Sequence, residues 1–98
     1  MRYEFHPEAE AEFIEAAAYY ERNVPGLGER FGNEVRGTIE RLLEYPELGF
    51  LINANLRRVM LTRFPYSLIY SATSDLLRVV AVAHARRRPG YWRPRIDR

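Results

Sequence analysis

The main change in the spacing of apolar residues along this 98-residue chain lies close to residue 45. Before that point apolar side chains recur every three or four residues, which is the period of an amphipathic helix. After it, apolar and polar residues alternate over short stretches, which is the period of a half-buried strand. Helices followed by strands indicate an α+β domain in which the helices cover one face of a sheet.

Two helices are expected in the first half. The first runs from Pro7 to about Arg22, with proline at the first helical position, and the second runs from Leu27 to about Glu44. Two glycines and a proline within residues 23–28 break the helix between them. The apolar stripes are Ala9, Phe13, Ala16 and Tyr20 in the first helix, and Leu27, Phe31, Val35, Thr38 or Ile39, and Leu42 in the second. The result is an α-hairpin whose stripes require a common partner surface.

Short strands are expected to supply that surface. They are Arg2–Phe5, Asn55–Thr62, Tyr66–Ser71 and Leu76–Arg86. The last strand is apolar on both faces in its middle, so it should lie inside the sheet. Alternation assigns Leu77, Val79, Ala81, Ala83 and Ala85 to one of its faces, and Arg78, Val80, Val82, His84 and Arg86 to the other. The order strand, helix, helix, strand, strand, strand predicts an antiparallel sheet, joined by the first strand at a central or edge position, and a basic C-terminal tail.

Composition indicates one domain, residues 1–98, and excludes several classes of protein. The chain contains no cysteine, which excludes disulfide frameworks and thiolate zinc sites. Its longest apolar runs span five residues, far fewer than the roughly 20 of a membrane helix, and its first residues lack the apolar core of a signal peptide. We therefore expect a cytoplasmic protein that does not enter a membrane. Because neither metal-ligand spacing nor a phosphate-binding glycine loop is present, we expect no metal and no cofactor.

Charge is distributed unevenly along the chain. Residues 1–49 contain eleven Glu and five Arg, whereas residues 50–98 contain ten Arg and two Asp. All 15 basic residues are arginine, the side chain that grips phosphate and carboxylate groups in bidentate fashion and stacks on aromatic rings. The asymmetry suggests an anionic partner, although a bias in genomic composition would produce the same preference for arginine.

The strongest candidate site is the segment His84–Trp92, which combines an imidazole, three arginines and two aromatic rings. RNA cleavage without a metal needs a base, an acid and fixed positive charge, which His, Tyr and Arg can supply. The same side chains would also bind an acidic protein segment that carries aromatic rings. The remaining alternative is a structural histidine beside a solvated tail.

A second cluster consists of Arg57, Arg58 and Arg63. Strand alternation places Arg57 and Arg63 on one face and Arg58 on the other, so only part of the cluster can share a site with His84. We expect Arg58 and Arg86 to do so. Alternatively, these arginines mask an exposed sheet edge.

The chain resembles the RelE/ParE superfamily of toxins from bacterial type II toxin–antitoxin systems. The segments that carry the resemblance are Ala16–Glu21, Pro25–Phe31, Pro46–Gly49, Arg57–Val59, Phe64–Tyr70 and Val82–Arg87. The resemblance implies a helical hairpin on an antiparallel sheet. It also implies a growth-inhibiting, plasmid-stabilising type of protein that forms a hetero-oligomer with an acidic antitoxin encoded beside it.

The superfamily divides by target. RelE-like members cut messenger RNA on the ribosome, using basic residues on the sheet and a C-terminal aromatic residue, whereas ParE-like members inhibit DNA gyrase. In RelE-like toxins a catalytic arginine commonly follows the tyrosine of the third-strand motif, and here that position is Ser67. The second-strand lysines are also absent, although Arg57 and Arg58 could replace their charge. The resemblance therefore favours the ParE-like branch and gyrase as the target.

Residue roles follow from these alternatives. The expected partner-binding residues are Arg57, Arg58, Arg63, His84, Arg86, Arg87, Arg88, Tyr91 and Trp92. If the chain is instead a nuclease, Arg58 and Arg86 would stabilise the phosphorane while His84 or Tyr91 moves protons. A third possibility is a degenerate module that binds antitoxin and has no toxicity.

Overall fold

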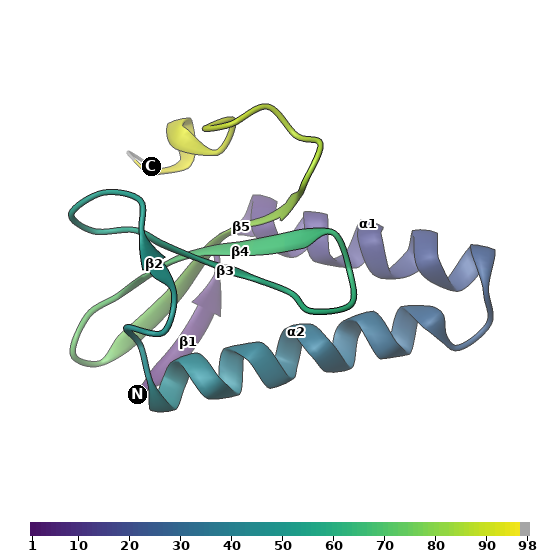
Figure 1. The fold of residues 1–98 in the computed structure, drawn as a ribbon, viewed down its shortest axis with the longest axis horizontal. Coiled ribbons are helices and arrows are strands. Elements are labelled where there is room, and N and C mark those ends of the chain that lie inside the picture. The colour runs from purple at the N-terminus through teal and green to yellow at the C-terminus, as the bar shows by residue number, and fades with distance from the viewer. Residues whose placement is uncertain (97–98) are drawn as a thin grey trace.

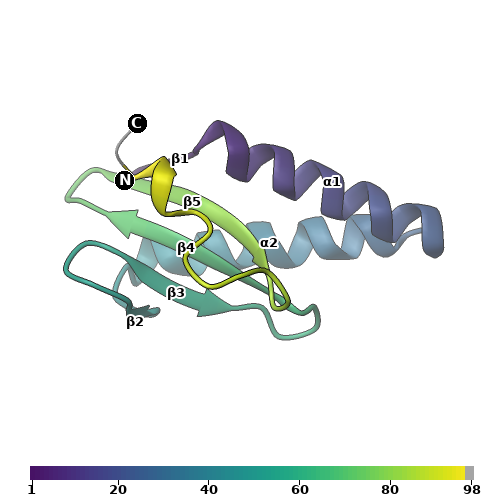
Figure 2. The ribbon, with the colours of Figure 1, turned by 90° about the horizontal axis from the view of Figure 1, so that it is seen from above.

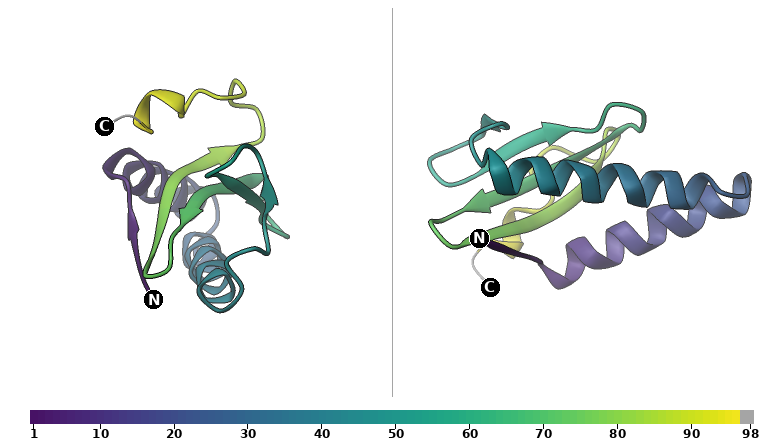
Figure 3. Two further views of the ribbon diagram at one scale, coloured as in Figure 1. Left: turned by 90° about the vertical axis from the view of Figure 1, so that its left-hand side faces the viewer. Right: turned by 90° about the horizontal axis from the view of Figure 1, so that it is seen from below.

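The computed structural model, which describes residues 1–96, has three layers (Figure 1, Figure 3). Two helices cover one face of a five-stranded sheet, and the C-terminal segment, residues 85–96, crosses the other face (Figure 2). The elements are β1 (Arg2–Phe5), α1 (Pro7–Asn23), α2 (Leu27–Glu44), β2 (Phe50–Leu51), β3 (Arg57–Met60), β4 (Tyr66–Ala72), β5 (Leu76–His84) and the 3₁₀ turn η1 (Arg93–Arg95). The α+β class expected from the sequence is confirmed.

The helical hairpin forms where the sequence predicts it. The Nδ1 atom of His6 accepts a hydrogen bond from the Glu8 N–H group (3.0 Å), which caps α1. Between the helices, Gly26 adopts a φ of +89°, a backbone conformation that glycine reaches without strain. The Glu21 carboxylate then accepts the N–H groups of Gly26 (2.9 Å) and Gly28 (3.0 Å) at the start of α2. Local chemistry therefore fixes both the turn and the helix boundaries.

The sheet has the order β1-β5-β4-β3-β2, with β5 inside it as predicted. The predicted antiparallel arrangement of the later strands is confirmed, and β1, for which no direction was predicted, pairs with β5 in parallel and makes the sheet mixed. Alternation within a four-residue strand cannot reveal the direction of its neighbour, so the sequence did not settle this point. The additional strand β2 was missed because two residues are too few to show alternation. Strand β3 is also shorter than the predicted Asn55–Thr62.

A β-bulge in β5 overturns the sequence-based assignment of its faces. Ile69 of β4 pairs with Ala81 and the next residue, Tyr70, pairs with Val79, so Val80 is an extra residue on β5. An extra residue reverses the alternation that follows it. Val82 consequently joins the core beneath the helices, and Ala81 and Ala83 join the core on the opposite face.

Two hydrophobic cores result. The larger lies between the helices and the sheet and contains Phe31, Val35, Ile39, Leu42, Leu68, Tyr70, Leu77 and Val79. The smaller lies beneath the C-terminal segment, where Trp92 packs with Leu56, Ile69, Val80, Ala81 and Ala83. Small side chains on this face of β5 let the C-terminal segment approach the sheet closely. Within residues 1–96, neither helix has a stretch that is long and apolar enough to span a lipid bilayer.

Replacement of Gly37 with alanine is expected to stabilise the chain. Gly37 lies inside α2, and a Cβ atom there would meet no heavy atom within 4 Å. The free energy of unfolding should rise by about 0.5–1 kcal/mol, because alanine restricts the unfolded chain and favours the helix. Urea denaturation measures the change. Gly28→Ala is the control and should destabilise, because its Cβ would lie 2.4 Å from the Ala17 carbonyl oxygen. A decrease in stability for Gly37→Ala would contradict the open surroundings of this position.

Candidate functional site

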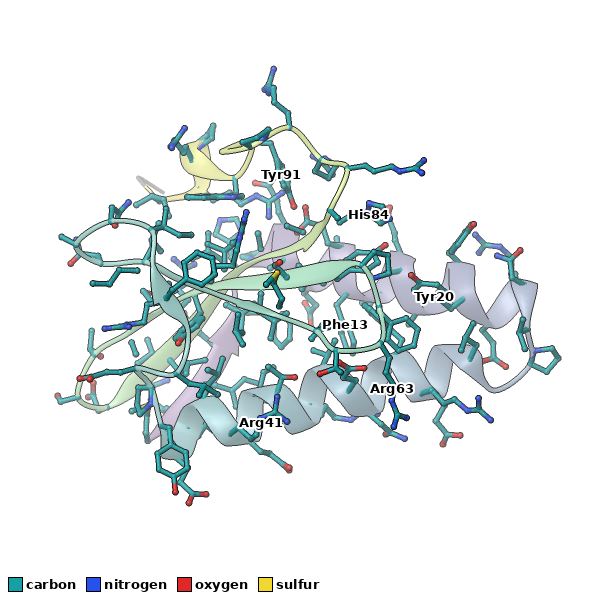
Figure 4. The ribbon with its side chains drawn as sticks, viewed as in Figure 1. Phe13, Tyr20, Arg41, Arg63, His84 and Tyr91 are labelled. Atoms are coloured by element: carbon teal, nitrogen blue, oxygen red, sulfur yellow. The ribbon has the colours of Figure 1, made fainter. Side chains whose placement is uncertain are left out.

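The C-terminal segment is held to α1 by a partly buried clasp centred on Glu12. The Glu12 carboxylate accepts hydrogen bonds from Arg95 Nη1 (3.0 Å), Arg95 Nη2 (2.8 Å) and the Tyr91 hydroxyl (2.7 Å). It also accepts the Val82 N–H (2.9 Å), and Arg95 Nη1 donates to the Val80 carbonyl (3.0 Å). The clasp thus joins helix, strand and tail, and Figure 4 shows Tyr91 on the tail above the sheet. Sequence reasoning assigned no role to Glu12 or Arg95.

The hydrogen bonds of the clasp favour the charged forms of Glu12 and Arg95. Burial alone would raise the pKa of Glu12, but hydrogen bonds from Arg95, Tyr91 and the Val82 N–H outweigh it and lower this pKa. The hydrogen bonds to Glu12 also raise the pKa of Arg95. Burial, followed by the hydrogen bond to Glu12, raises the pKa of the Tyr91 hydroxyl above its ordinary value. Tyr91 is therefore kept protonated, with its proton directed at Glu12.

The aromatic residues of the tail have structural contacts. Trp92 is 3% exposed and packs in the smaller core. The Arg87 guanidinium lies over the Tyr91 ring, with its Cζ atom 3.7 Å from the ring centroid. A partner role for Trp92 and Tyr91 stays a prediction, while packing and the clasp already account for where both rings lie.

His84 ends β5 on the side that faces the helices, as a result of the bulge. Its ring packs edge-on against Tyr66, with centroids 5.0 Å apart, and its Nδ1 atom accepts the Arg86 N–H (2.9 Å). His84 lines a small pocket, whose other lining residues include Glu12, Glu15 and Tyr19 of α1. The strand stops here rather than at the predicted Arg86, because the chain turns and the Arg87 N–H donates to the His84 carbonyl (3.0 Å).

A second pocket, of about 230 Å³, opens on the other face of the sheet. It is lined by Arg58, Met60, Ser67, Ala83, His84, Ala85, Arg87, Arg88, Pro89, Tyr91 and Trp92. Arg88, rather than Arg86, lines this pocket together with Arg58. Strand β5 ends at His84, two residues before the predicted Arg86. A site shared by Arg58 and Arg86 stays a prediction. Among the described residues the buried Arg58 Nε atom has no hydrogen-bond partner.

The two remaining arginines lie elsewhere. Arg57 donates through Nη1 to the carbonyl groups of Gly49 (2.7 Å) and Glu47 (3.2 Å), which ties the loop before β2 to the sheet. Arg63 belongs to the loop between β3 and β4 and lines a groove of about 820 Å³ beside α2. This groove was not predicted, although Arg30 and Arg41 on α2 lie eleven residues apart, close to three helical turns, and that spacing places them on one face.

No cluster of His, Asp or Glu within residues 1–96 is arranged to hold a metal ion. The candidate binding groups are guanidinium groups. They lie in three places: the clasp, the pocket beside Arg58 and the groove beside α2.

Comparison with known proteins identifies the family. A family model described as the ParE toxin of the type II toxin–antitoxin system parDE matches residues 3–89. The chain belongs to the ParE toxin family. Comparison with curated protein sequences found no match. Among solved structures, the fold is similar to one titled "Chromosomal ParDE TA system from P. aeruginosa". That likeness has a TM-score of 0.60 and 16% identity, and covers 86% of this chain and 95% of that one.

Some of the residues described above lie inside the region that the ParE family model matches, and others lie beyond it. Glu12, His84, Arg87 and Arg88 lie inside the matched region, whereas Tyr91, Trp92 and Arg95 follow it. In this ParE family member the clasp therefore joins a residue of the matched domain to a segment beyond it.

Proposed function

We propose that this ParE family toxin arrests growth by inhibiting DNA gyrase in the cytoplasm. Membership of the ParE family carries the proposal. Ser67 at the position of a catalytic arginine in RelE-like toxins supports it, because chemistry requires a full set of mutually positioned groups. On this interpretation His84, Arg87 and Arg88 are interface residues rather than catalytic ones.

The surroundings of the proposed proton-transfer groups also favour inhibition by binding. Tyr91 directs its proton at Glu12, and the raised pKa of its hydroxyl opposes deprotonation. His84 accepts a backbone N–H at Nδ1 and packs on Tyr66. Arg58, His84 and Tyr91 all line the pocket of about 230 Å³, but the His84 Nδ1 atom and the Tyr91 hydroxyl are already engaged in hydrogen bonds within the chain, which favours binding over proton transfer.

Induction of the chain in cells that lack an antitoxin is expected to stop DNA synthesis before protein synthesis, because gyrase is required ahead of the replication fork. Pulse-labelling of DNA and protein in the same culture gives the order. The purified chain should also inhibit supercoiling by gyrase, with heat-denatured protein as the control. Undisturbed supercoiling at high toxin concentration would contradict the proposal.

The second candidate is a ribosome-dependent endoribonuclease, and the pocket shared by Arg58 and Arg88 favours it, because two guanidiniums suit a phosphate group. Early loss of translation and cleavage of ribosome-bound transcripts would support it, provided that Arg58→Ala abolishes the cleavage. Harmless overexpression would instead indicate a degenerate module.

An acidic antitoxin is the expected partner whether the chain acts on gyrase or on ribosome-bound RNA. The toxin and the antitoxin should form a hetero-oligomer. The basic second half of the chain supports a partner of opposite charge. We propose that the antitoxin contacts both helices and the arginine-bearing strands, with a rate of association that falls as salt rises.

A further inference from the structure

The pocket of about 230 Å³ beside Arg58, here called the Arg58 pocket, is built from two parts of the chain. Residues of β3, β4 and β5 line one side of it, and residues of the C-terminal segment line the other. Figure 1 shows the C-terminal segment lying over this face of the sheet. Because that segment supplies one of the two sides, the pocket is complete only while the segment is docked.

The Arg58 pocket carries positive charge that the described chain does not neutralise. Arg58, Arg87 and Arg88 line the pocket, and neither Asp nor Glu does. Within residues 1–96, Arg58 and Arg88 form no ion pair, and the buried Arg58 Nε atom has no hydrogen-bond partner. The ion pair of Arg87 with Glu12 is long, with 3.9 Å between Nη1 and the carboxylate oxygen. Guanidinium groups gathered in this way favour a bound anion.

The size and geometry of the Arg58 pocket select a single phosphate group. The pocket is smaller than the roughly 300–1,000 Å³ of sites for drug-sized ligands, so it admits one anionic group and little beyond it. Arg58 belongs to the sheet and Arg88 to the segment above it, so the pocket has a guanidinium on each of its two sides. A phosphate monoester has three acceptor oxygens and nearly two negative charges at neutral pH, which suit two guanidiniums, whereas a carboxylate has two oxygens and one charge.

The aromatic rings of the Arg58 pocket are already engaged within the chain. Trp92 is 3% exposed and packs on the sheet. The Tyr91 ring lies under the Arg87 guanidinium, with 3.7 Å between Cζ and the ring centroid. Stacking of a nucleic-acid base needs an open ring face. We therefore expect a ligand to be recognised through its phosphate rather than through a base.

The clasp holds the C-terminal segment in the position that completes the pocket. Glu12 lies outside the pocket, but its carboxylate accepts hydrogen bonds from Tyr91 and Arg95 of the segment. Between Arg88 and Tyr91 the chain turns at Gly90, whose φ is +76°, and the Tyr91 N–H donates to the Arg88 carbonyl (3.2 Å). The clasp and this turn together fix where Arg88 lies relative to the sheet.

We propose that the Arg58 pocket binds a single phosphate monoester group, and that phosphate binding and closure of the clasp stabilise each other. The linkage is reciprocal, because a ligand that needs the docked segment must also favour docking. The inference goes beyond the proposed action on gyrase and does not depend on it.

The first probe is inorganic phosphate, titrated into the full chain at constant ionic strength. Trp92 is the only tryptophan and lines the pocket, so its emission should change on binding. The Nε–H resonances of Arg58 and Arg88 should shift in the same titration. Acetate should bind severalfold more weakly, because it carries one charge instead of nearly two. Equal affinity for acetate, or shifts confined to other arginines, would overturn the proposal.

Two DNA tetranucleotides distinguish the sources of the phosphate group. A strand with a 5′-phosphate should bind as inorganic phosphate does if the ligand is the end of a nucleic-acid strand. If it does not bind while inorganic phosphate does, the ligand is a free phosphate. The same strand without a terminal phosphate should bind more weakly, because each diester carries a single charge. Equal binding by the two strands would overturn the assignment to a monoester.

Two double variants of equal net charge separate the pocket from charge in general. Arg58→Gln and Arg88→Gln together should weaken phosphate binding at least about tenfold, because hydrogen bonds between charged groups are the strong ones. Arg30→Gln and Arg41→Gln together should leave it nearly unchanged, since both arginines are exposed on α2 and do not line the pocket. Equal weakening by both double variants would overturn the proposal.

Glu12→Gln separates the linkage to the clasp from simple electrostatics. If charge alone acted, loss of a carboxylate near a cationic pocket would tighten anion binding. The linkage predicts the opposite: a segment that is undocked in about two thirds of molecules lowers the apparent affinity about threefold. Glu15→Gln is the control, because it makes the same change of charge on α1 outside the clasp, and it should not weaken binding. Unchanged or tighter binding by Glu12→Gln would overturn the linkage.

Gly90→Ala tests the linkage without a change of charge. Gly90 does not line the pocket, its φ is unfavourable for alanine, and a Cβ atom there would crowd the Arg93 guanidinium. The variant should therefore loosen the turn and weaken phosphate binding. Gly37→Ala, at an open position of α2, should not. Wild-type affinity in a folded Gly90→Ala variant would contradict the linkage.

The reciprocal measurement needs only a folded wild type. Phosphate should raise the urea concentration at which Trp92 emission shifts to longer wavelength, because it binds the docked segment. The double variant Arg58→Gln, Arg88→Gln should show only the general stabilisation that phosphate salts produce. Equal rises for the two proteins would overturn the linkage. A chain that inhibits gyrase but binds no phosphate would overturn this inference and leave the proposed function intact.

Discussion

Replacement of Glu12 with glutamine is expected to lower the free energy of unfolding by about 3 kcal/mol, because it leaves the buried Arg95 guanidinium with only a more exposed carboxylate, that of Glu8, as its counter-charge. Arg95 is 6% exposed, and its nearest other carboxylate, Glu8, lies 3.6 Å from Nε and is much more exposed than Glu12. Glutamine also offers Tyr91, Arg95 and the Val82 N–H one acceptor oxygen in place of two. The loss should therefore exceed that of an ordinary surface ion pair.

Urea denaturation measures the loss, and fluorescence shows where it occurs. Trp92 is the only tryptophan of the chain and packs on the sheet beneath the C-terminal segment. Release of this segment should shift its emission to longer wavelength before the helices unfold. Glu15→Gln is the matched control, because Glu15 lies on the same helix, is exposed and takes no part in the clasp. Similar losses for the two variants would show that the clasp does not stabilise the fold.

The clasp also predicts a dependence of stability on pH. Because the pKa of Glu12 is lower in the folded chain than its ordinary value of 4.5, its carboxylate stabilises the fold fully above that value. The contribution is lost as pH falls through the lowered pKa. Wild type should therefore lose stability in acid more steeply than Glu12→Gln, which has no carboxyl group to protonate.

Local patterns predicted most of the fold. The hairpin follows from two apolar stripes and a loop rich in glycine and proline, and α2 spans the predicted Leu27–Glu44. The prediction from alternation failed in β5, where a single extra residue changes the register with β4. Val80 is apolar like its neighbours, so nothing in the sequence of β5 marks the bulge that moves His84 to the helix side.

The site was less predictable than the fold, because it depends on contacts between distant residues. Glu12 and Arg95 are 83 residues apart, and the uneven distribution of charge along the chain did not single out either residue. Helical spacing placed Tyr20 on the apolar stripe of the first helix, but it could not show that Tyr20 and Phe64 line a groove with Arg63. The excess of Glu in the first half and of Arg in the second half was the one sequence signal consistent with the clasp.

Replacement of Phe31 with alanine is expected to cost about 3–5 kcal/mol, because it removes a ring from the centre of the larger core and leaves a cavity. Phe31 is fully buried and packs against four rings, with centroid distances of 5.9 Å to Phe13, 5.4 Å to Tyr20, and 5.1 Å to both Phe64 and Tyr66. Phe50→Ala is the matched control, because Phe50 is 55% exposed and should cost less than about 1 kcal/mol. Urea denaturation at neutral pH compares the two.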